Sequence, residues 1–281
     1  MDKAILVYDL ATGKEIDSKA GLDDLGAPSV SAYSPDGKHL LVGGQKGIVR
    51  IWAVDAEGEL DTLGDFVGHA DEIQSIEVLP DNQTVISSDK QKQVRAWSLD
   101  DQKEKYSIPD LEQETVDIGI APDGKSGMLV AKNSLVSMFN LSDGRVTSSQ
   151  PVFKPQLVGQ TALLSPDGTQ LFIPELYKVW CHTLKGKQSA SIDTGEMPWA
   201  LAYCPKTNEV FSGGNSKIHV CDFKTVTRTS ILSTGADISG YVHDVSVSPD
   251  GRYVVAIGGP IGQSVLIFDR QSPKNPAKED Q

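Results

Sequence analysis

The sequence has few of the features that mark membrane, secreted and metal-binding proteins. It has no run of about 18 uninterrupted apolar residues, which excludes a predicted membrane span, and Met1-Asp2-Lys3 leads straight into a predicted strand rather than a signal peptide. Three cysteines, Cys181, Cys204 and Cys221, form no C-x-x-C pair and lie in apolar runs, which predicts buried thiols. With only 5 histidines, a zinc site is not expected. We therefore expect a cytoplasmic protein without metal or cofactor, unless a segment upstream of Met1 carries a targeting signal.

Positive charge is also scarce. The chain of 281 residues has 26 Lys and Arg against 38 Asp and Glu, a net charge of −12, which argues against a nucleic-acid binder. Hydrophobic residues make up 39% of the chain, which is enough to build a large core and too many for a disordered protein. Its 26 glycines and 15 prolines favour turns over helices. The composition indicates an acidic, soluble, turn-rich protein.

A turn motif recurs along the chain. Its prolines are spaced 45, 42, 44, 39 and 44 residues apart. Proline presets φ, Asp bonds the local backbone and Gly accepts a positive φ, so each copy predicts a hairpin turn between two apolar strands. The copies are Ser34-Pro35-Asp36-Gly37, Leu79-Pro80-Asp81-Asn82, Ala121-Pro122-Asp123-Gly124, Ser165-Pro166-Asp167-Gly168, Cys204-Pro205-Lys206-Thr207 and Ser248-Pro249-Asp250-Gly251.

A third strand recurs with the same period. It ends in an aromatic residue, or a substitute, followed by a polar or small residue: Tyr8-Asp9, Trp52-Ala53, Trp97-Ser98, Phe139-Asn140, Trp180-Cys181, Cys221-Asp222 and Phe268-Asp269. A fourth, polar strand precedes the next repeat, introduced by turns such as Ala11-Thr12-Gly13-Lys14, Ser142-Asp143-Gly144-Arg145 and Leu184-Lys185-Gly186-Lys187. Four strands in about 43 residues are typical of a β-propeller blade, so the predicted class is all-β, a β-propeller of four-stranded antiparallel blades.

These repeats resemble the WD40 family over nearly the whole chain. The best copy is Gly68-His69 followed 28 residues after the His by Trp97-Ser98, and Val49-Arg50-Ile51-Trp52 is similar to the third strand of the family. The family's hydrogen-bond network of His, Ser, Asp and Trp is expected to be broken, because Gln91 and Lys46 stand six residues before the two tryptophans where an Asp is expected. The blades are therefore expected to depend on packing, with Trp52, Trp97 and Trp180 buried between blades.

The ends of the chain leave two arrangements open. The pattern predicts six first, six second, six fourth and seven third strands, that is, six full repeats plus half of a seventh. Either the propeller has seven blades with an incomplete first blade, whose missing hairpin lies upstream in a longer polypeptide, or six blades close with one strand left over. We assign residues 1–271 to the propeller and 272–281 to a polar, flexible tail. An open strand edge would also allow edge-to-edge self-association, which a monomer at micromolar concentration would exclude.

No catalytic motif emerges. The pairs Gly43-Gly44, Gly213-Gly214 and Gly258-Gly259 fit no phosphate-binding loop and are interpreted as turn glycines. The sequence has no G-x-S-x-G motif. His69 and His243 precede first strands, where repeat position explains them better than catalysis. We therefore predict no catalytic, cofactor-binding or metal-binding residues.

The loops that join fourth to first and second to third strands gather on one face of a propeller, where partners bind. Exposed aromatic residues among charged ones are typical of binding hot spots, which draws attention to Trp199 and Tyr177. For Trp199 a packing role beneath its loop competes with that interpretation, and for Lys92 ordinary solvation does. The candidate partner-binding residues are Asp71, Lys92, Tyr177, Trp199, Asn215 and Tyr241.

The resemblance implies a non-catalytic scaffold that binds a protein or peptide. The net charge and the lack of a long apolar run predict no nucleic acid or membrane partner. The alternative is a propeller enzyme such as a lactonase-like hydrolase in the central channel. That alternative needs converging carboxylates, for which the candidates are Asp71, Asp117, Glu175, Asp237 and Asp244. A third possibility is a regulatory or sensor domain of a longer parent protein.

Overall fold

The computed structural model describes residues 4–108, 111–120, 124–132, 135–151, 162–165, 169–184, 189–204, 206–222, 224–234, 240–259 and 264–271. The chain divides into two compact units, Met1–Pro155 and Gln156–Gln281. The described residues are strands and turns, and among them there is no helix of the length and hydrophobicity that crossing a bilayer requires. The predicted tail at 272–281 lies outside these residues.

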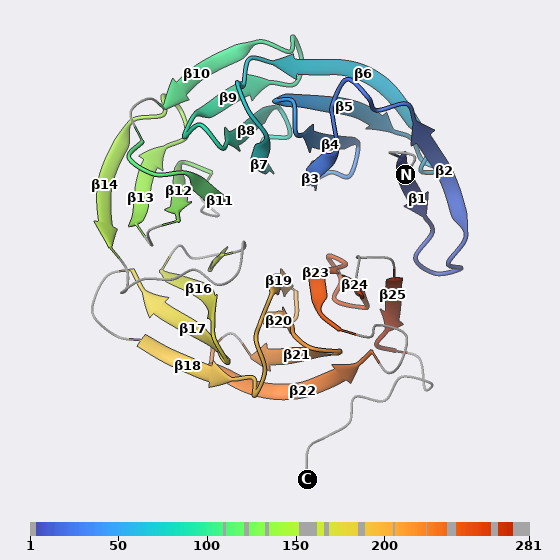
Figure 1. Cartoon of the computed structure of the whole chain (residues 1–281), viewed down its shortest axis with the longest axis vertical. Helices are drawn as coiled ribbons and strands as arrows, with labels where there is room; N and C mark the ends of the chain where they lie inside the picture. The colour runs from blue at the N-terminus through green and yellow to red at the C-terminus, as the bar shows by residue number, and fades with distance from the viewer. Residues whose placement is uncertain are drawn as a thin grey trace. The chain divides into compact units, whose positions relative to one another are not determined.

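Fourteen strands belong to the first unit, drawn from blue to yellow-green in Figure 1. They are β1 (Ala4–Tyr8), β2 (Glu15–Ala20), β3 (Pro28–Tyr33), β4 (His39–Gly44), β5 (Ile48–Val54), β6 (Leu60–Val67), β7 (Ile73–Val78), β8 (Thr84–Asp89), β9 (Val94–Ser98), β10 (Glu104–Ile108), β11 (Thr115–Ile120), β12 (Ser126–Ala131), β13 (Leu135–Asn140) and β14 (Val146–Pro151).

Eleven strands belong to the second unit. They are β15 (Leu163–Leu164), β16 (Gln170–Glu175), β17 (Lys178–Thr183), β18 (Ser189–Asp193), β19 (Ala200–Cys204), β20 (Glu209–Gly213), β21 (Lys217–Asp222), β22 (Thr227–Ser233), β23 (Val242–Val247), β24 (Tyr253–Gly258) and β25 (Ser264–Asp269).

Consecutive strands pair antiparallel in every sheet. Five sheets of the described residues have four strands: β3–β6, β7–β10, β11–β14, β15–β18 and β19–β22. A two-stranded sheet, β1–β2, begins the first unit, and a three-stranded sheet, β23–β25, ends the second. The chain therefore has the predicted fold class, a β-propeller of four-stranded antiparallel blades. The described strands also occur in the predicted numbers, six first, six second, seven third and six fourth strands, with β1 and β25 both third strands. The number of blades stays a prediction.

The Pro-Asp-Gly turns have the predicted chemistry where the structure describes them. The Ser34 hydroxyl donates to Asp36 Oδ1 at 2.6 Å, and the Gly37 amide donates to the Ser34 carbonyl at 2.8 Å with φ of +71°. Ser248 and Asp250 repeat this arrangement. The corresponding turns at 121–123, 166–168 and 205, and the turn at 185–188, lie outside the described residues.

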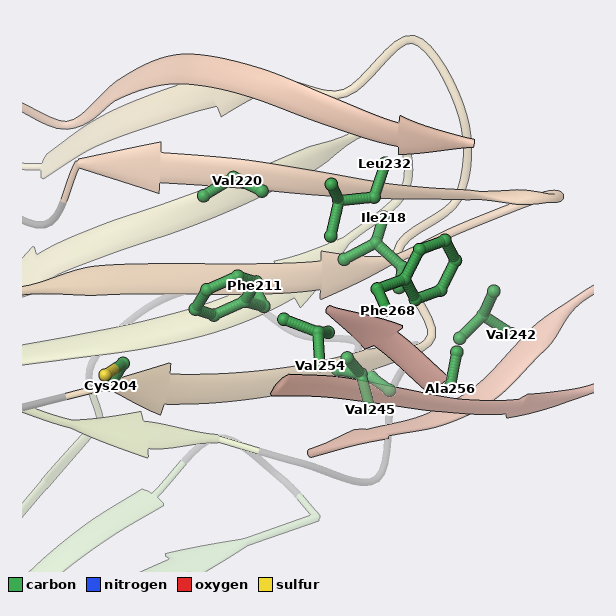
Figure 2. Close-up of a cluster of buried hydrophobic side chains, with 11 residues drawn as sticks. Cys204, Phe211, Ile218, Val220, Leu232, Val242, Val245, Val254, Ala256 and Phe268 are labelled. Atoms are coloured by element: carbon green, nitrogen blue, oxygen red, sulfur yellow. The ribbon is translucent and has the colours of Figure 1, made fainter. Parts of the chain in front are cut away.

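Apolar side chains fill the space between neighbouring sheets within each unit. In the first unit, Leu41, Val49 and Ile51 pack with Ile76 and Val85 of the next sheet. In the second unit, one buried cluster joins β19–β22 to β23–β25, as Figure 2 shows. Because inner strands are covered on both faces, they are buried throughout rather than at alternate positions, as in β8 (Thr84–Asp89), where Ser87, Ser88 and Asp89 are as inaccessible as Val85 and Ile86.

Two of the three tryptophans predicted between blades are buried. Trp52 and Trp97 are almost inaccessible, and Trp97 stacks on Phe66 of the preceding sheet at 5.1 Å between ring centroids. Trp180 is only half-buried, so this part of the prediction is wrong. The reason is register: Leu171 pairs with His182 as Val85 pairs with Trp97, so His182 occupies the buried position and Trp180 lies two residues earlier.

The predicted loss of the polar network is wrong for the sheet β7–β10. The His69 ring donates from Nδ1 to Asp89 Oδ2 at 3.0 Å, its Nε2 lies 2.7 Å from Ser87 Oγ, and Trp97 Nε1 donates to Ser87 Oγ at 2.8 Å. Burial lowers the pKa of His69 despite the Asp89 carboxylate, so the ring is neutral at pH 7. The Asp that completes the network stands eight residues before Trp97, at the end of β8, rather than six.

The paired glycines serve close packing more than turn formation. A Cβ on Gly44 would lie 2.2 Å from the Leu25 carbonyl oxygen, and one on Gly213 would lie 2.6 Å from Val242. Neither residue has a positive φ, whereas Gly259 does, at +99°. The interpretation as turn glycines therefore needs correction at Gly43-Gly44 and Gly213, which end strands β4 and β20.

Candidate interaction surface

The six predicted site residues divide between the two units. Asp71 and Lys92 lie in the first unit, on the loops before β7 and between β8 and β9. Tyr177, Trp199, Asn215 and Tyr241 lie in the second unit, also on loops before first strands or between second and third strands. Within the second unit, Trp199, Asn215 and Tyr241 come together.

The Trp199 and Tyr241 rings form the centre of this group. Their centroids are 4.9 Å apart with the planes at 62°, an edge-to-face contact of the kind that aromatic quadrupoles favour. Tyr241 remains 46% exposed, and Trp199 is half-buried. The Trp199 ring therefore packs against its neighbour and is still accessible, and its part in binding stays a prediction.

Backbone hydrogen bonds fix the loops that carry these rings. The Trp199 amide donates to the Gly213 carbonyl at 2.8 Å, and the Val242 amide donates to the Gly214 carbonyl at 2.9 Å. Asn215 forms an isolated antiparallel bridge with Tyr241. We call Trp199, Asn215 and Tyr241 the aromatic surface. Its residues lie on loops that these backbone bonds hold to the strand ends, so little conformational entropy would be lost on binding.

His243 and Tyr177 extend this neighbourhood in different ways. The His243 ring lies 6.4 Å from the Tyr241 ring, and its Nε2 is 3.0 Å from the Gly259 carbonyl oxygen. Tyr177, 57% exposed, is in the tight turn between β16 and β17, and its carbonyl accepts bonds from the Thr194 amide and hydroxyl. The Tyr177 loop is thus tied to the loop that leads to Trp199.

The equivalent loops of the first unit are charged and already paired. Lys92 has a φ of +67°, and its Nζ donates to the Glu112 carbonyl at 2.9 Å. Asp71 Oδ1 accepts from the neighbouring Glu72 amide, and Lys90 Nζ bonds Glu72 at 2.7 Å. Asp71 and Lys92 therefore each have a hydrogen-bond partner within the chain, and their part in binding stays a prediction.

The carboxylates considered for an enzyme are placed as follows. Asp117 is in β11, Glu175 ends β16, and Asp244 is in β23, while Asp237 lies outside the described residues. Glu77 of β7 was not singled out from the sequence, although burial and the Asp117 carboxylate raise its pKa to about 8. In the part of the chain that the structure describes, no group of three or more His, Cys, Asp or Glu is arranged to hold a metal ion.

Comparisons with known proteins agree with the repeat pattern. The family model "WD domain, G-beta repeat" matches residues 27–53 and 60–98. "Pre-mRNA-processing factor 19" of Caenorhabditis elegans is 26% identical over 137 residues, which are 49% of this chain and 27% of that protein. "WD repeat-containing protein 26 homolog" of Arabidopsis thaliana is 26% identical over 145 residues, 50% of this chain and 23% of that protein.

A further relative is matched over a longer stretch. "Protein groucho" of Drosophila melanogaster is 22% identical over 191 residues, 65% of this chain and 25% of that protein. The chain therefore spans about a quarter of the length of the curated relatives that it matches.

Proposed function

Because this chain carries repeats of the WD40 family, we propose that it is a non-catalytic, cytoplasmic scaffold that binds a protein or peptide through the aromatic surface. The observation that carries the proposal is the accessible pair of Trp199 and Tyr241, held edge to face on fixed backbone. Asp71, Lys92 and Tyr177 stay in the proposal as predicted secondary contacts.

Residue chemistry supports this location. Trp and Tyr are the side chains most enriched at the energetic centres of interfaces, because each covers a large area and has few rotatable bonds. A partner segment with an apolar or proline side chain would pack on the two rings, and the Asn215 amide group would bond its backbone. In the described loops of the first unit, Lys90 is paired with Glu72 and Lys92 is bonded to the Glu112 carbonyl, so both ammonium groups already have partners.

The test uses peptides selected on the folded chain. A phage-displayed peptide library is panned against the wild-type protein, and the affinities of the selected peptides are measured by fluorescence anisotropy. We expect Tyr241→Ala to weaken binding about tenfold or more, as truncation of a hot-spot aromatic does. The matched control is Tyr33→Ala, which removes a tyrosine of similar exposure, 52%, from β3 of the first unit.

Two results would overturn the proposal. Either no peptide is selected, or the selected peptides bind Tyr241→Ala and Tyr33→Ala equally well. In the second case the binding surface lies elsewhere on the chain.

A further inference from the structure

A half-buried carboxylate and a buried imidazole are hydrogen-bonded at the loop that carries Trp199. His219 of β21 is almost wholly buried, and its Nε2 lies 2.9 Å from Glu196 Oε1. Glu196 belongs to the loop between β18 and β19, three residues before Trp199. Burial lowers the pKa of His219 in spite of the Glu196 carboxylate, so the neutral ring donates its Nε2 proton to Glu196.

Strand register relates this pair to the network of the sheet β7–β10. Ser212 pairs with His219 as Ser87 pairs with Arg95, and Gly213 pairs with Ile218 as Ser88 pairs with Val94. Gly214 therefore stands where β8 has Asp89. In the same way, Cys221 stands where β9 has Trp97.

The carboxylate missing from position 214 is replaced from the loop. A Cβ on Gly214 would lie 2.7 Å from Glu196 Oε1, so the Glu196 side chain fills the space that an Asp side chain at 214 would need. In β7–β10 the loop supplies the imidazole, His69, and the strand supplies the carboxylate, Asp89. In β19–β22 the loop supplies the carboxylate and the strand supplies the imidazole.

We propose that Glu196 and His219 form a rearranged counterpart of the His69–Asp89 pair and act as positioning residues for the Trp199 loop. The bond ties the loop to the central strand β21, and two neighbouring contacts act with it. Thr194 is bonded to the Tyr177 carbonyl, and the Trp199 amide is bonded to Gly213. Loss of the pair would leave a buried imidazole donor unpaired and free the loop that orients Trp199.

The experiment measures amide hydrogen exchange of the full chain by mass spectrometry. In Glu196→Ala we expect the hydrogen-bonded amides of Thr194 and Trp199 to exchange about tenfold faster or more, because opening of the loop costs less. Glu196→Gln retains an oxygen acceptor for His219 Nε2 and is expected to exchange more slowly than Glu196→Ala. Lys90→Ala, which removes an exposed ion pair from a first-unit loop, is the control and leaves these amides unchanged.

A second variant tests directly whether a carboxylate at position 214 can replace the one that the loop supplies. Gly214→Asp alone is expected to be destabilising, because its Cβ meets the Glu196 carboxylate. In the Glu196→Ala background the same substitution puts a carboxylate at the position of Asp89, so we expect slow exchange and thermal stability to be partly restored. Such opposite effects in the two backgrounds would be a coupling that independent sites do not have.

The inference fails if Glu196→Ala exchanges like the wild type, or if the double variant is no more stable than the two single effects predict. Its consequence for binding rests on the proposed function, but the exchange and stability measurements need no ligand. If the exchange and stability effects are as expected but no peptide is selected, only the proposed function is overturned. If those effects are missing while Tyr241→Ala still weakens peptide binding, only the positioning role is overturned.

Discussion

The hydroxyl of Ser87 is the most informative single group to remove. It is fully buried, accepts from Trp97 Nε1 at 2.8 Å, and bonds His69 Nε2 at 2.7 Å. Ser87→Ala would leave the indole N–H and an imidazole nitrogen without a partner. Each buried group left unsatisfied costs about 1–3 kcal/mol, so for two groups we expect the free energy of unfolding to fall by roughly 2–6 kcal/mol.

The chain supplies a matched control for this substitution. Ser212 stands at the same register position in β20 and is equally buried, but its hydroxyl has no hydrogen-bond partner among the described residues. Ser212→Ala removes an unsatisfied polar group rather than a bonded one, so we expect a change within about 0.5 kcal/mol, or a slight gain.

Both variants are measured by equilibrium urea unfolding, followed by circular dichroism and tryptophan fluorescence. The comparison is valid if the m-values match that of the wild type, since a changed m-value would indicate a changed unfolding transition. Equal losses in the two variants, or a Ser87→Ala protein as stable as the wild type, would refute the reasoning from bonded and unbonded hydroxyls.

Three further predictions follow from the packing and the titratable groups. Gly44→Ala puts a Cβ 2.2 Å from the Leu25 carbonyl oxygen and should lower the urea midpoint far more than Gly37→Ala, where the only cost is a positive φ, about 1 kcal/mol. Burial raises the pKa of Cys221 to about 12, so iodoacetamide at pH 8 should leave this thiol unmodified in the folded chain and modify it in urea, as mass spectrometry would reveal. The Glu77 carboxyl, whose pKa rises from 4.5 to about 8, binds its proton more tightly in the folded state; its contribution to stability is complete at low pH and is lost as the pH rises towards 8. Glu77→Gln should therefore gain stability relative to the wild type between pH 5 and 8 in urea titrations, and a constant difference would contradict the assignment.

The fold could be predicted because turn chemistry and strand pattern repeat together. Ser34-Pro35-Asp36-Gly37 specifies its own hairpin, and an apolar run on each side specifies two inner strands. The same local rules then apply in each repeat, so the strand census needed no knowledge of long-range contacts.

Errors arose where strand register, rather than composition, decides the position of a residue. Trp180 looks like the repeat aromatic, but pairing of Leu171 with His182 places the histidine in that role. Asp89 was not identified from the sequence, because the length of the hairpin between β8 and β9 sets how many residues separate it from Trp97. Glu196 and His219 gave no repeat signal at all, since each stands at a position where the other repeats have different residues.

The aromatic surface was predicted residue by residue but not as a group. Loop location and residue type pointed to Trp199, Asn215 and Tyr241 separately. Their contact depends on the bonds of Trp199 to Gly213 and of Val242 to Gly214, which join the loops before β19 and β23 to the end of β20. These backbone hydrogen bonds cannot be predicted from the spacing of residues in the sequence.

The repeat that the family model matches begins one strand earlier than the β-sheet with which it overlaps. The second family match, residues 60–98, takes in β6 of one sheet together with β7, β8 and β9 of the next. A protease that nicks the exposed turn at Asp55–Glu57 would cut the peptide between β5 and β6 while their ladder of hydrogen bonds stays in place. The two pieces would remain joined by the β5–β6 hydrogen bonds. Two fragments produced separately, with their boundary in this turn, should therefore reassemble into the native sheet.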